Sequence, residues 1–277
     1  MNGTENFNND LSKIANNLRI RILDIVNKFN TSHIGSCYSV IDILVVLYDT
    51  LLNVSPTTTN EKYRDRLFMS KGHASLAIYT ILEYYKFFKN DLLDDFTRNG
   101  TFFTGHVNSK INGVDYSTGS LGHALGVACG SALNSKINNI NNKIVVIASD
   151  GELNEGSNWE AILFASQFKL DNLILIIDFN KIQSFGFVKD VMNLDPLDDK
   201  FRSFNWDCIN IDGHNYQEIF NSFSDICLIK NSKPKCIIAH TIKGKGVSFM
   251  ENKLLWHYKS PNSEEYKLAM NELNKNA

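Results

Sequence analysis

The sequence predicts an α/β protein with a doubly wound, mostly parallel sheet flanked by helices. Short apolar, β-branched runs alternate with longer segments of helical periodicity, which is the pattern of a parallel sheet covered on both faces. The chain has 277 residues, 43% hydrophobic and 21% charged, so it can bury a substantial core like other globular proteins. No linker-like composition interrupts it, and we expect one domain over residues 1–277.

The N-terminal part is expected to be mainly helical. Apolar residues at helical spacing predict an amphipathic helix over 11–29, and a polar break follows at 30–36. A second helix, more apolar all round, is expected over 40–52, and a third helix over 74–88. Residues 104–120 are rich in Gly, Ser, Thr and Asn without periodicity. They predict a long loop, and loops of that length inside compact domains are usually functional.

From Gly122 onward the sequence alternates regularly between buried strands and helices. The expected strands are 144–148, 173–178, 208–211 and 236–239. The expected helices are 124–132, 159–168, 200–204 and 216–227.

Charge and cysteine usage exclude several classes of protein. The formal net charge of −2 argues against nucleic acid or an anionic membrane as the main partner. The five cysteines are odd in number and contain no C-x-x-C pair, which indicates buried thiols in a reducing compartment. The polar N-terminus is not a signal peptide, and the apolar runs are too short to span a bilayer. We therefore expect a soluble cytoplasmic protein.

Two strand ends carry the residues that point to chemistry. The expected strand before Asp150 stops at Ser-Asp-Gly, and the next one stops in polar residues around Asn180. If the two strands are neighbours, Asp150 and Asn180 direct oxygen atoms into one crevice, where they suit Mg²⁺ or Ca²⁺. Taken alone, Asp150 is equally well explained as a helix cap or turn former, and Asn180 is better explained as a turn residue.

Five separated motifs, in order, resemble the transketolase family over nearly the whole chain. The segments Asp150–Gly151, 155–156, 159–161 and 178–180 resemble its thiamine diphosphate motif, usually written GDG, spacer, Asn. Ser149 occupies the position of the first Gly of that motif, and because serine is small we expect the cofactor site to be retained. The other motifs are TSHIGS at 31–36, DRLFMSKGH at 65–73, GH at 105–106 with TGSLG at 118–122, and TIKGKGV at 241–247 followed by Trp256–His257.

The resemblance implies a role for each matching residue. Metal ligands would be Asp150, Asn180 and the backbone carbonyl of Ile182, holding Mg²⁺ or Ca²⁺. Catalytic residues would be His33, His73, His106 and His257, because neutral imidazoles can move a hydroxyl proton and stabilise a developing oxyanion. Residues binding thiamine diphosphate would be His73, Gly119, Ser120, Leu121, Asp150, Gly151, Glu155, Asn180, Lys243 and His257. Glu155 and Glu160 match acidic residues near the family's subunit interface.

Several of these residues also have ordinary structural explanations that involve no catalysis or binding. His73 and His106 follow glycines in loops, where exposed histidines are common, and Lys243 could belong to a basic turn. Glu155 suits the first turn of any helix. The other histidines, His123, His214 and His240, match no site.

The resemblance also implies a partner. Full-length transketolases continue into a second α/β domain, which supplies a glutamate to the cofactor's aminopyrimidine ring and most of the groups that grip the sugar phosphate. This chain stops at Ala277, soon after the Trp256–His257 motif. We therefore expect a separate C-terminal, pyrimidine-binding transketolase subunit, with two copies of each chain in a heterotetramer. Together they would transfer a two-carbon ketol unit between sugars or sugar phosphates.

Two alternatives stay open. One is the alpha subunit of another thiamine diphosphate enzyme, of the 2-oxoacid dehydrogenase type, although the four histidines favour a polyhydroxylated substrate. The other is a non-catalytic partner subunit, which the departures at Ser149 and Tyr258 would fit. Relatives often carry Gly where this chain has Tyr258, so its ring would narrow the substrate entrance.

Overall fold

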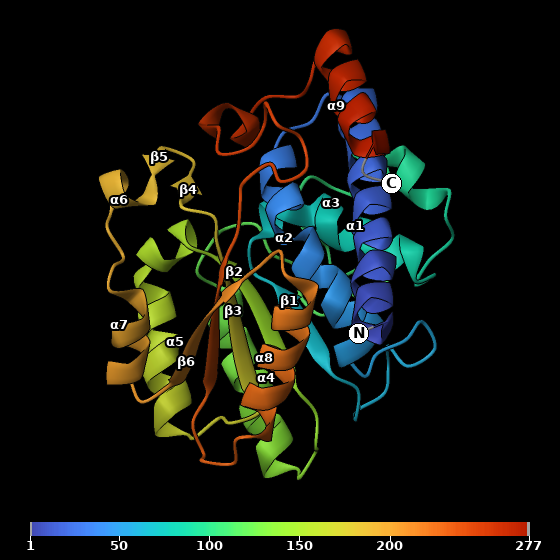
Figure 1. Cartoon of the computed structure of the whole chain (residues 1–277). Helices are drawn as coiled ribbons and strands as arrows, with labels where there is room; N and C mark the ends of the chain where they lie inside the picture. The colour runs from blue at the N-terminus through green and yellow to red at the C-terminus, as the bar shows by residue number, and fades with distance from the viewer. Residues whose placement is uncertain (1, 276–277) are drawn as a thin grey trace.

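A five-stranded parallel sheet forms the centre of the chain (Figure 1). The computed structural model describes residues 2–275. The strand order is β1-β2-β3-β7-β6, and every neighbouring pair is parallel. These strands are β1 (Arg66–Met69), β2 (Ile144–Ser149), β3 (Leu173–Phe179), β6 (Asp207–Asp212) and β7 (Lys235–His240). A separate antiparallel hairpin consists of β4 (Ile182–Gln183) and β5 (Gly186–Phe187).

Helices cover both faces of the sheet, which confirms the predicted doubly wound α/β fold. The first face carries α1 (Asn2–Phe29), α2 (Ile34–Val46), α3 (Ser75–Tyr84), α8 (Tyr216–Leu228) and α9 (Ser263–Lys275). The second carries α4 (Ala124–Ile137), α5 (Gly156–Gln167) and α7 (Leu197–Ser203). The short α6 (Val188–Val191) follows β5. In Figure 1, α5 and α7 lie on one side of the sheet and α1, α2 and α8 on the other.

Strand side chains divide between the two cores by simple alternation. In β2, Val145 and Ile147 pack into the first core, whereas Ile144 and Val146 pack into the second. Both sets are fully buried, which explains why these strands are uninterrupted apolar runs in the sequence.

Several element boundaries differ from the prediction. Helix α2 begins at Ile34, so the polar break that was expected to reach residue 36 is shorter. Helix α3 ends at Tyr84 and not near residue 88. Strand β1 was not predicted, because it has only four residues and begins with Arg66. Helix α9 was not predicted either; its weakly apolar face packs on α1, where Asn16 donates to the Leu273 carbonyl at 2.9 Å. The predicted loop 104–120 contains no helix or strand.

One helical stretch, Ile34–Leu51, is long and apolar enough to cross a membrane. Within the described residues it is the sole candidate, and 83% of it is buried inside the fold. A central helix of a packed domain has the same composition, because it is apolar all round.

The register of the sheet brings the two predicted strand ends together. Strands β2 and β3 are neighbours, with Ser149 opposite Asp178. Asp150 and Asn180 therefore follow adjacent strands at the same carboxyl edge, which is where ligands bind in open parallel sheets.

Candidate active site

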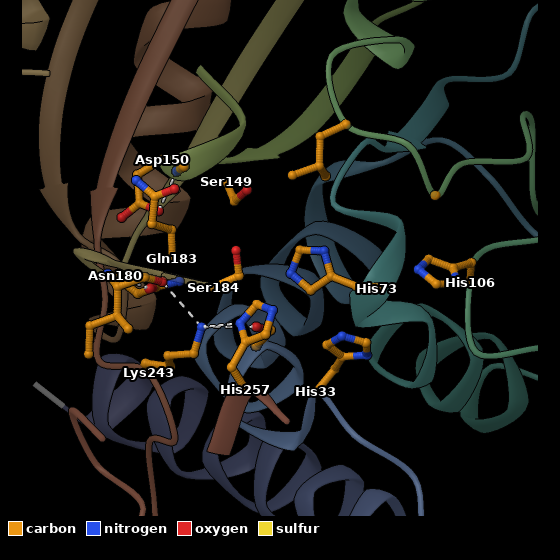
Figure 2. Close-up of a pocket in the computed structure, with 15 residues that line it drawn as sticks. His33, His73, His106, Ser149, Asp150, Asn180, Gln183, Ser184, Lys243 and His257 are labelled. Carbon is orange, nitrogen blue, oxygen red and sulfur yellow. Dashed lines mark hydrogen bonds between the residues drawn. The ribbon is translucent and has the colours of Figure 1, made fainter. Parts of the chain in front are cut away.

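Four histidines from distant parts of the chain meet in one cavity at this edge (Figure 2). His33 precedes α2, His73 lies in the turn before α3, His106 in the long loop and His257 in the segment after β7. The ring centre of His33 lies 5.3 Å from that of His73 and 6.1 Å from that of His106. His257 lies 5.1 Å from His33 and 5.5 Å from His73. All four predicted histidines thus form one cluster.

Burial keeps three of these imidazoles neutral near pH 7. Burial and the neighbouring His106 and Lys243 lower the pKa of His33 from 6.5 to about 4. Burial and Lys243 lower the pKa of His257 to about 3. Burial, with Lys71 next, lowers the pKa of His73 well below 6.5. A neutral imidazole offers one donor and one acceptor nitrogen, which suits hydrogen bonding to hydroxyl and carbonyl groups.

The backbone of His33 is held in an uncommon conformation. Its φ of 73° lies in the left-handed region, which is rarely occupied by residues other than glycine. The His33 N–H donates to the His257 carbonyl at 3.0 Å, and the His33 carbonyl accepts from the Ser36 N–H at 3.0 Å. Such a conformation costs about 1–3 kcal/mol and occurs preferentially at functional sites.

On the other side of the cavity, Asp150 and Asn180 line its wall, as predicted (Figure 2). The Asp150 carboxylate accepts from the N–H groups of Gly151 at 2.7 Å and Lys181 at 2.5 Å. Among the described residues no Lys or Arg side chain forms an ion pair with it. Burial and the nearby Asp178 raise the pKa of Asp150 to about 6. The cavity therefore contains a buried acid without a paired cation.

Lys243 joins the two sides of the cavity. Its ammonium lies 3.0 Å from His257 Nδ1 and 3.2 Å from both the Ile182 carbonyl and the Ser36 hydroxyl. Because the ammonium only donates, Nδ1 of His257 must be the acceptor nitrogen. Burial and the charge of Lys71 lower the pKa of Lys243 to about 8, so it is still mostly cationic at pH 7.

A buried ion pair forms the floor beneath these residues. Lys71 contacts the Asp178 carboxylate, and both side chains are 0% exposed. The Ser39 hydroxyl donates to the same carboxylate at 2.6 Å, and the Thr241 hydroxyl donates to its other oxygen. Lys71 also donates to the Ser36 carbonyl at 3.0 Å. Four segments of the chain are thus joined below the cavity.

The loop from Gly119 to Gly122 is anchored by a second buried acid. Glu152 accepts from the Gly122 N–H at 2.9 Å, from the Ser149 N–H at 3.3 Å and from the Ser70 hydroxyl. Burial raises its pKa. Gly122 has φ +86°, and a Cβ there would lie 2.7 Å from the Glu155 Cβ. Glu152 was not predicted, because a single acid near a strand end resembles an ordinary helix-start residue.

Two of the predicted cofactor residues do not line the cavity. Ser120 is exposed, and Glu155 is an exposed residue at the start of α5 that packs against Gly122. The remaining predicted residues do line it: His33, His73, His106, Gly119, Leu121, Asp150, Gly151, Asn180, Ile182, Lys243 and His257. The cavity wall also includes Ser36, Ser149, Gln183 and Ser184.

Sequence reasoning could have found some of these additional residues. Ser36 belongs to the TSHIGS motif, and Ser149 replaces the first glycine of the GDG motif, with its side chain at the cavity wall (Figure 2). Gln183 and Ser184 follow Asn180 with no recognisable spacing, and only the β4–β5 hairpin turns them toward the cavity.

Tyr258, which was expected to narrow the substrate entrance, lies beside His257 and does not itself line the cavity. Its ring centre is 4.8 Å from that of His257, and its hydroxyl donates to the Ser184 carbonyl at 3.1 Å. It also borders an adjoining hollow together with His33, His73 and His106.

The residues around Asp150 fit a hard cation bound together with an anionic ligand. No cluster of three or more His, Cys, Asp or Glu side chains suited to a metal is found in the described part of the chain. The potential ligand atoms of Asp150, Asn180 and the Ile182 carbonyl are oxygens. Asn180 Oδ1 accepts from the Ile182 N–H at 3.1 Å, and each of these oxygens keeps a free lone pair beyond its hydrogen bonds. Mg²⁺ typically takes one or two carboxylates and completes its shell with phosphate oxygens and water.

Comparison with known proteins identifies the class to which this fold and site belong. The family model described as transketolase, thiamine diphosphate binding domain, matches residues 11–274. One of the subunits of the apulose-4-phosphate transketolase of Phocaeicola vulgatus is 38% identical, over 92% of this chain and 90% of that protein. The 6-deoxy-6-sulfo-D-fructose transketolase subunit SqwG of Clostridium sp. is 39% identical, over 96% and 97%. A crystal structure of transketolase from Campylobacter jejuni superimposes with a TM-score of 0.88 at 33% identity, over 95% of this chain and 42% of that one.

The parallel sheet and its carboxyl-edge cavity are thus those of a thiamine diphosphate-binding domain. The chain belongs to the transketolase family, of which it represents the N-terminal, thiamine diphosphate-binding part.

Proposed function

We propose that this chain is the cofactor-binding subunit of a two-chain transketolase. The observation that carries the proposal is the juxtaposition, in one cavity, of four histidines with the Asp150–Asn180 strand edge. The chain would bind thiamine diphosphate and Mg²⁺ and, with its partner, transfer a two-carbon ketol unit between sugars. We further propose that residues 1–277 act as one domain.

In this proposal each side of the cavity has its own task. Asp150, Asn180 and the Ile182 carbonyl would hold the cation that neutralises the diphosphate. Lys243, whose ammonium already faces the Ile182 carbonyl, adds a second positive charge on the same side. Gly151, which we propose to contact the diphosphate, packs closely on the facing wall, because a Cβ there would lie 2.7 Å from the Gln183 Cβ.

The histidines would act on the sugar. Thiamine diphosphate, when bound, supplies the group that stabilises the carbanion formed by cleaving a bond next to a carbonyl. The cleavage also requires a hydroxyl proton to leave and charge on an oxygen to be stabilised. His33 and His73, neutral at pH 7, can hydrogen bond sugar hydroxyls as donor or acceptor and can hold such a proton. Neutral His257, whose Nδ1 already accepts from Lys243, can only donate to the sugar through Nε2.

The partner is inferred from the relatives. Two proteins that match this chain along almost their full length are named as transketolase subunits, so each works as part of a larger assembly. We propose an equivalent C-terminal, pyrimidine-binding subunit here, with two copies of each chain in the cytoplasm. The names of those relatives, which include apulose 4-phosphate and 6-deoxy-6-sulfo-D-fructose, support sugars or sugar phosphates as the substrates here.

Calorimetric titration of thiamine diphosphate with Mg²⁺ tests the proposal. We would titrate this chain alone and mixed with a candidate partner chain, using Asp150→Asn as the test variant. Asp171→Asn is the control, because Asp171 pairs with Lys136 away from the cavity. The proposal requires saturable binding in wild type and Asp171→Asn that is lost in Asp150→Asn. A folded wild-type protein that binds no cofactor, either alone or in the mixture, would contradict it.

A further inference from the structure

His214 links the first-face core to the segment that carries Lys243. It lies in the turn between β6 and α8, and its side chain is 11% exposed. One ring nitrogen, Nδ1, lies 2.6 Å from the Asp42 carboxylate. The other, Nε2, lies 2.8 Å from the backbone nitrogen of Ile242, the residue directly before Lys243. The ring therefore spans two segments that are far apart in the sequence.

These two contacts determine where the proton on the ring is. A backbone N–H can only donate, so Nε2 of His214 must be the unprotonated acceptor. The ring proton is then on Nδ1 and is donated to Asp42. His214 is accordingly neutral, in the tautomer that the carboxylate selects.

Asp42 is itself held by a buried network. Arg19 donates to its two oxygens at 3.0 and 2.7 Å, and the Tyr216 hydroxyl donates at 2.8 Å. Burial alone would raise the pKa of Asp42, but Arg19 and His214 lower it overall, so the carboxylate stays charged. Arg19 also donates to the Tyr38 carbonyl at 3.1 Å. The acceptor for His214 is thus fixed in position by α1, α2 and α8.

The segment held by His214 reaches directly into the cavity. Thr241 donates through its hydroxyl to Asp178, and Lys243 contacts His257 and the Ile182 carbonyl. On the other side, Gly213 donates to the His240 carbonyl at 2.9 Å. A Cβ at Gly213 would lie 2.5 Å from Thr241 Cγ2, so the turn and the segment are in close contact.

We propose that His214 is a positioning residue for the candidate active site. By accepting the Ile242 N–H, it fixes the backbone at the residue before Lys243 and thereby the place of the Lys243 ammonium. Asp42 acts through it by selecting the tautomer that leaves Nε2 free to accept. The inference rests on the proposed function only for its effect on cofactor binding. The relay itself, meaning the two hydrogen bonds from His214 to Asp42 and from the Ile242 N–H to His214, can be measured in the protein alone.

The relay is tested first without any ligand. Two-bond ¹H–¹⁵N correlation spectra should show His214 neutral at pH 7, with its proton on Nδ1. Amide hydrogen exchange at Ile242 should be about tenfold faster in His214→Phe, because the variant keeps a ring of similar size but removes the acceptor. His214→Gln should restore the protection, since a carboxamide provides one donor and one acceptor.

The effect on the site is tested with thiamine diphosphate and Mg²⁺ as the titrated ligands. We expect His214→Phe to weaken binding by about 10–100-fold, by analogy with the loss of residues that orient metal ligands. His214→Gln should stay within about threefold of wild type. The matched control is His240→Phe, because His240 lies at the same edge but its Nε2 contacts Asn210, 2.9 Å away. It should leave both exchange at Ile242 and affinity unchanged.

The outcomes separate this inference from the proposed function. A proton on Nε2, a charged His214 at pH 7, or unchanged exchange at Ile242 in a folded His214→Phe would overturn the relay. Unchanged affinity in that variant, with wild type binding normally, would overturn its role in the site. If wild type itself binds no cofactor, the proposed function fails, and the spectra and exchange rates still decide the relay.

Discussion

Lys71 and Asp178 form the buried contact whose removal best tests how the cavity floor is held together. Lys71→Met removes the ammonium but keeps a linear apolar side chain of similar length. The Asp178 carboxylate is then left without its counter-charge, because its other donors are neutral: the hydroxyls of Ser39 and Thr241 and, at 3.5 Å, the Asn180 amide. Asp178→Asn makes the reciprocal change, since it leaves Lys71 buried and unpaired, and its single carboxamide oxygen can replace only one of the two oxygens that accept from Ser39 and Thr241.

The expected magnitude follows from burial. Both side chains are 0% exposed, so solvent cannot screen the uncompensated charge. Removing one partner of such a pair typically costs about 3–5 kcal/mol. The two hydroxyl donors each offset about 0.5–1.5 kcal/mol for the carboxylate, so Lys71→Met should fall at the lower end. Removing both charges eliminates the unpaired ion, and the double variant should be more stable than the sum of the single losses predicts by about 2–3 kcal/mol.

Urea unfolding of the four proteins in this cycle, at constant pH and salt, gives these free energies. The control is Lys136→Met, which breaks an ion pair with Asp171 whose side chains are 34% and 29% exposed. It should cost about 1 kcal/mol or less. If the two single losses simply add in the double variant to within about 0.5 kcal/mol, the pair is not coupled and the reasoning is wrong.

Three further predictions concern the walls of the cavity. Because the pKa of His33 is lowered from 6.5 to about 4, the unfolded chain binds a proton more readily than the folded one, so stability should fall as pH drops from 6.5 toward 4. In urea titrations at several pH values, His33→Gln should make the free energy of unfolding depend less on pH over this range. Gly122→Ala should destabilise the protein by about 1–3 kcal/mol, because φ is +86° and the new Cβ would meet Glu155. Gly126→Ala on α4 meets nothing within 4 Å and should stabilise the protein by about 0.5–1 kcal/mol. Thermal unfolding would refute this reasoning if both variants changed stability in the same direction. Glu152→Gln should cost about 1–3 kcal/mol in the same assay, because its amide would place a donor against N–H and O–H donors; a neutral effect would show that Glu152 is already protonated and donating.

The fold was largely predictable because its signals are local. Each central strand is buried on both faces and therefore reads as an unbroken apolar run, as in Ile144–Ser149 and Leu173–Phe179. Strand β1 was missed because four residues beginning with Arg66 carry too little periodicity. The start of α2 was misplaced because His33 takes a positive φ, which a non-glycine residue does not signal.

Most residues that line the cavity could be named from the sequence, whereas the residues that hold them in place through hydrogen bonds could not. The motif histidines, Asp150, Asn180 and Lys243 were all named from short sequence patterns, and they line one cavity. Glu152 and His214 were missed. Their significance comes from partners such as Ser70 and Asp42, which lie far away in the sequence.

By itself, the amino-acid sequence determined the alternation of strands and helices and the kinds of chemical group available at the strand ends, because these depend on local periodicity and residue type. Only the tertiary structure decided which groups are buried, which tautomer His214 adopts and how far the pKa values of the histidines fall. Those properties depend on desolvation and on charges a few ångströms away, and both are set by how separate segments pack.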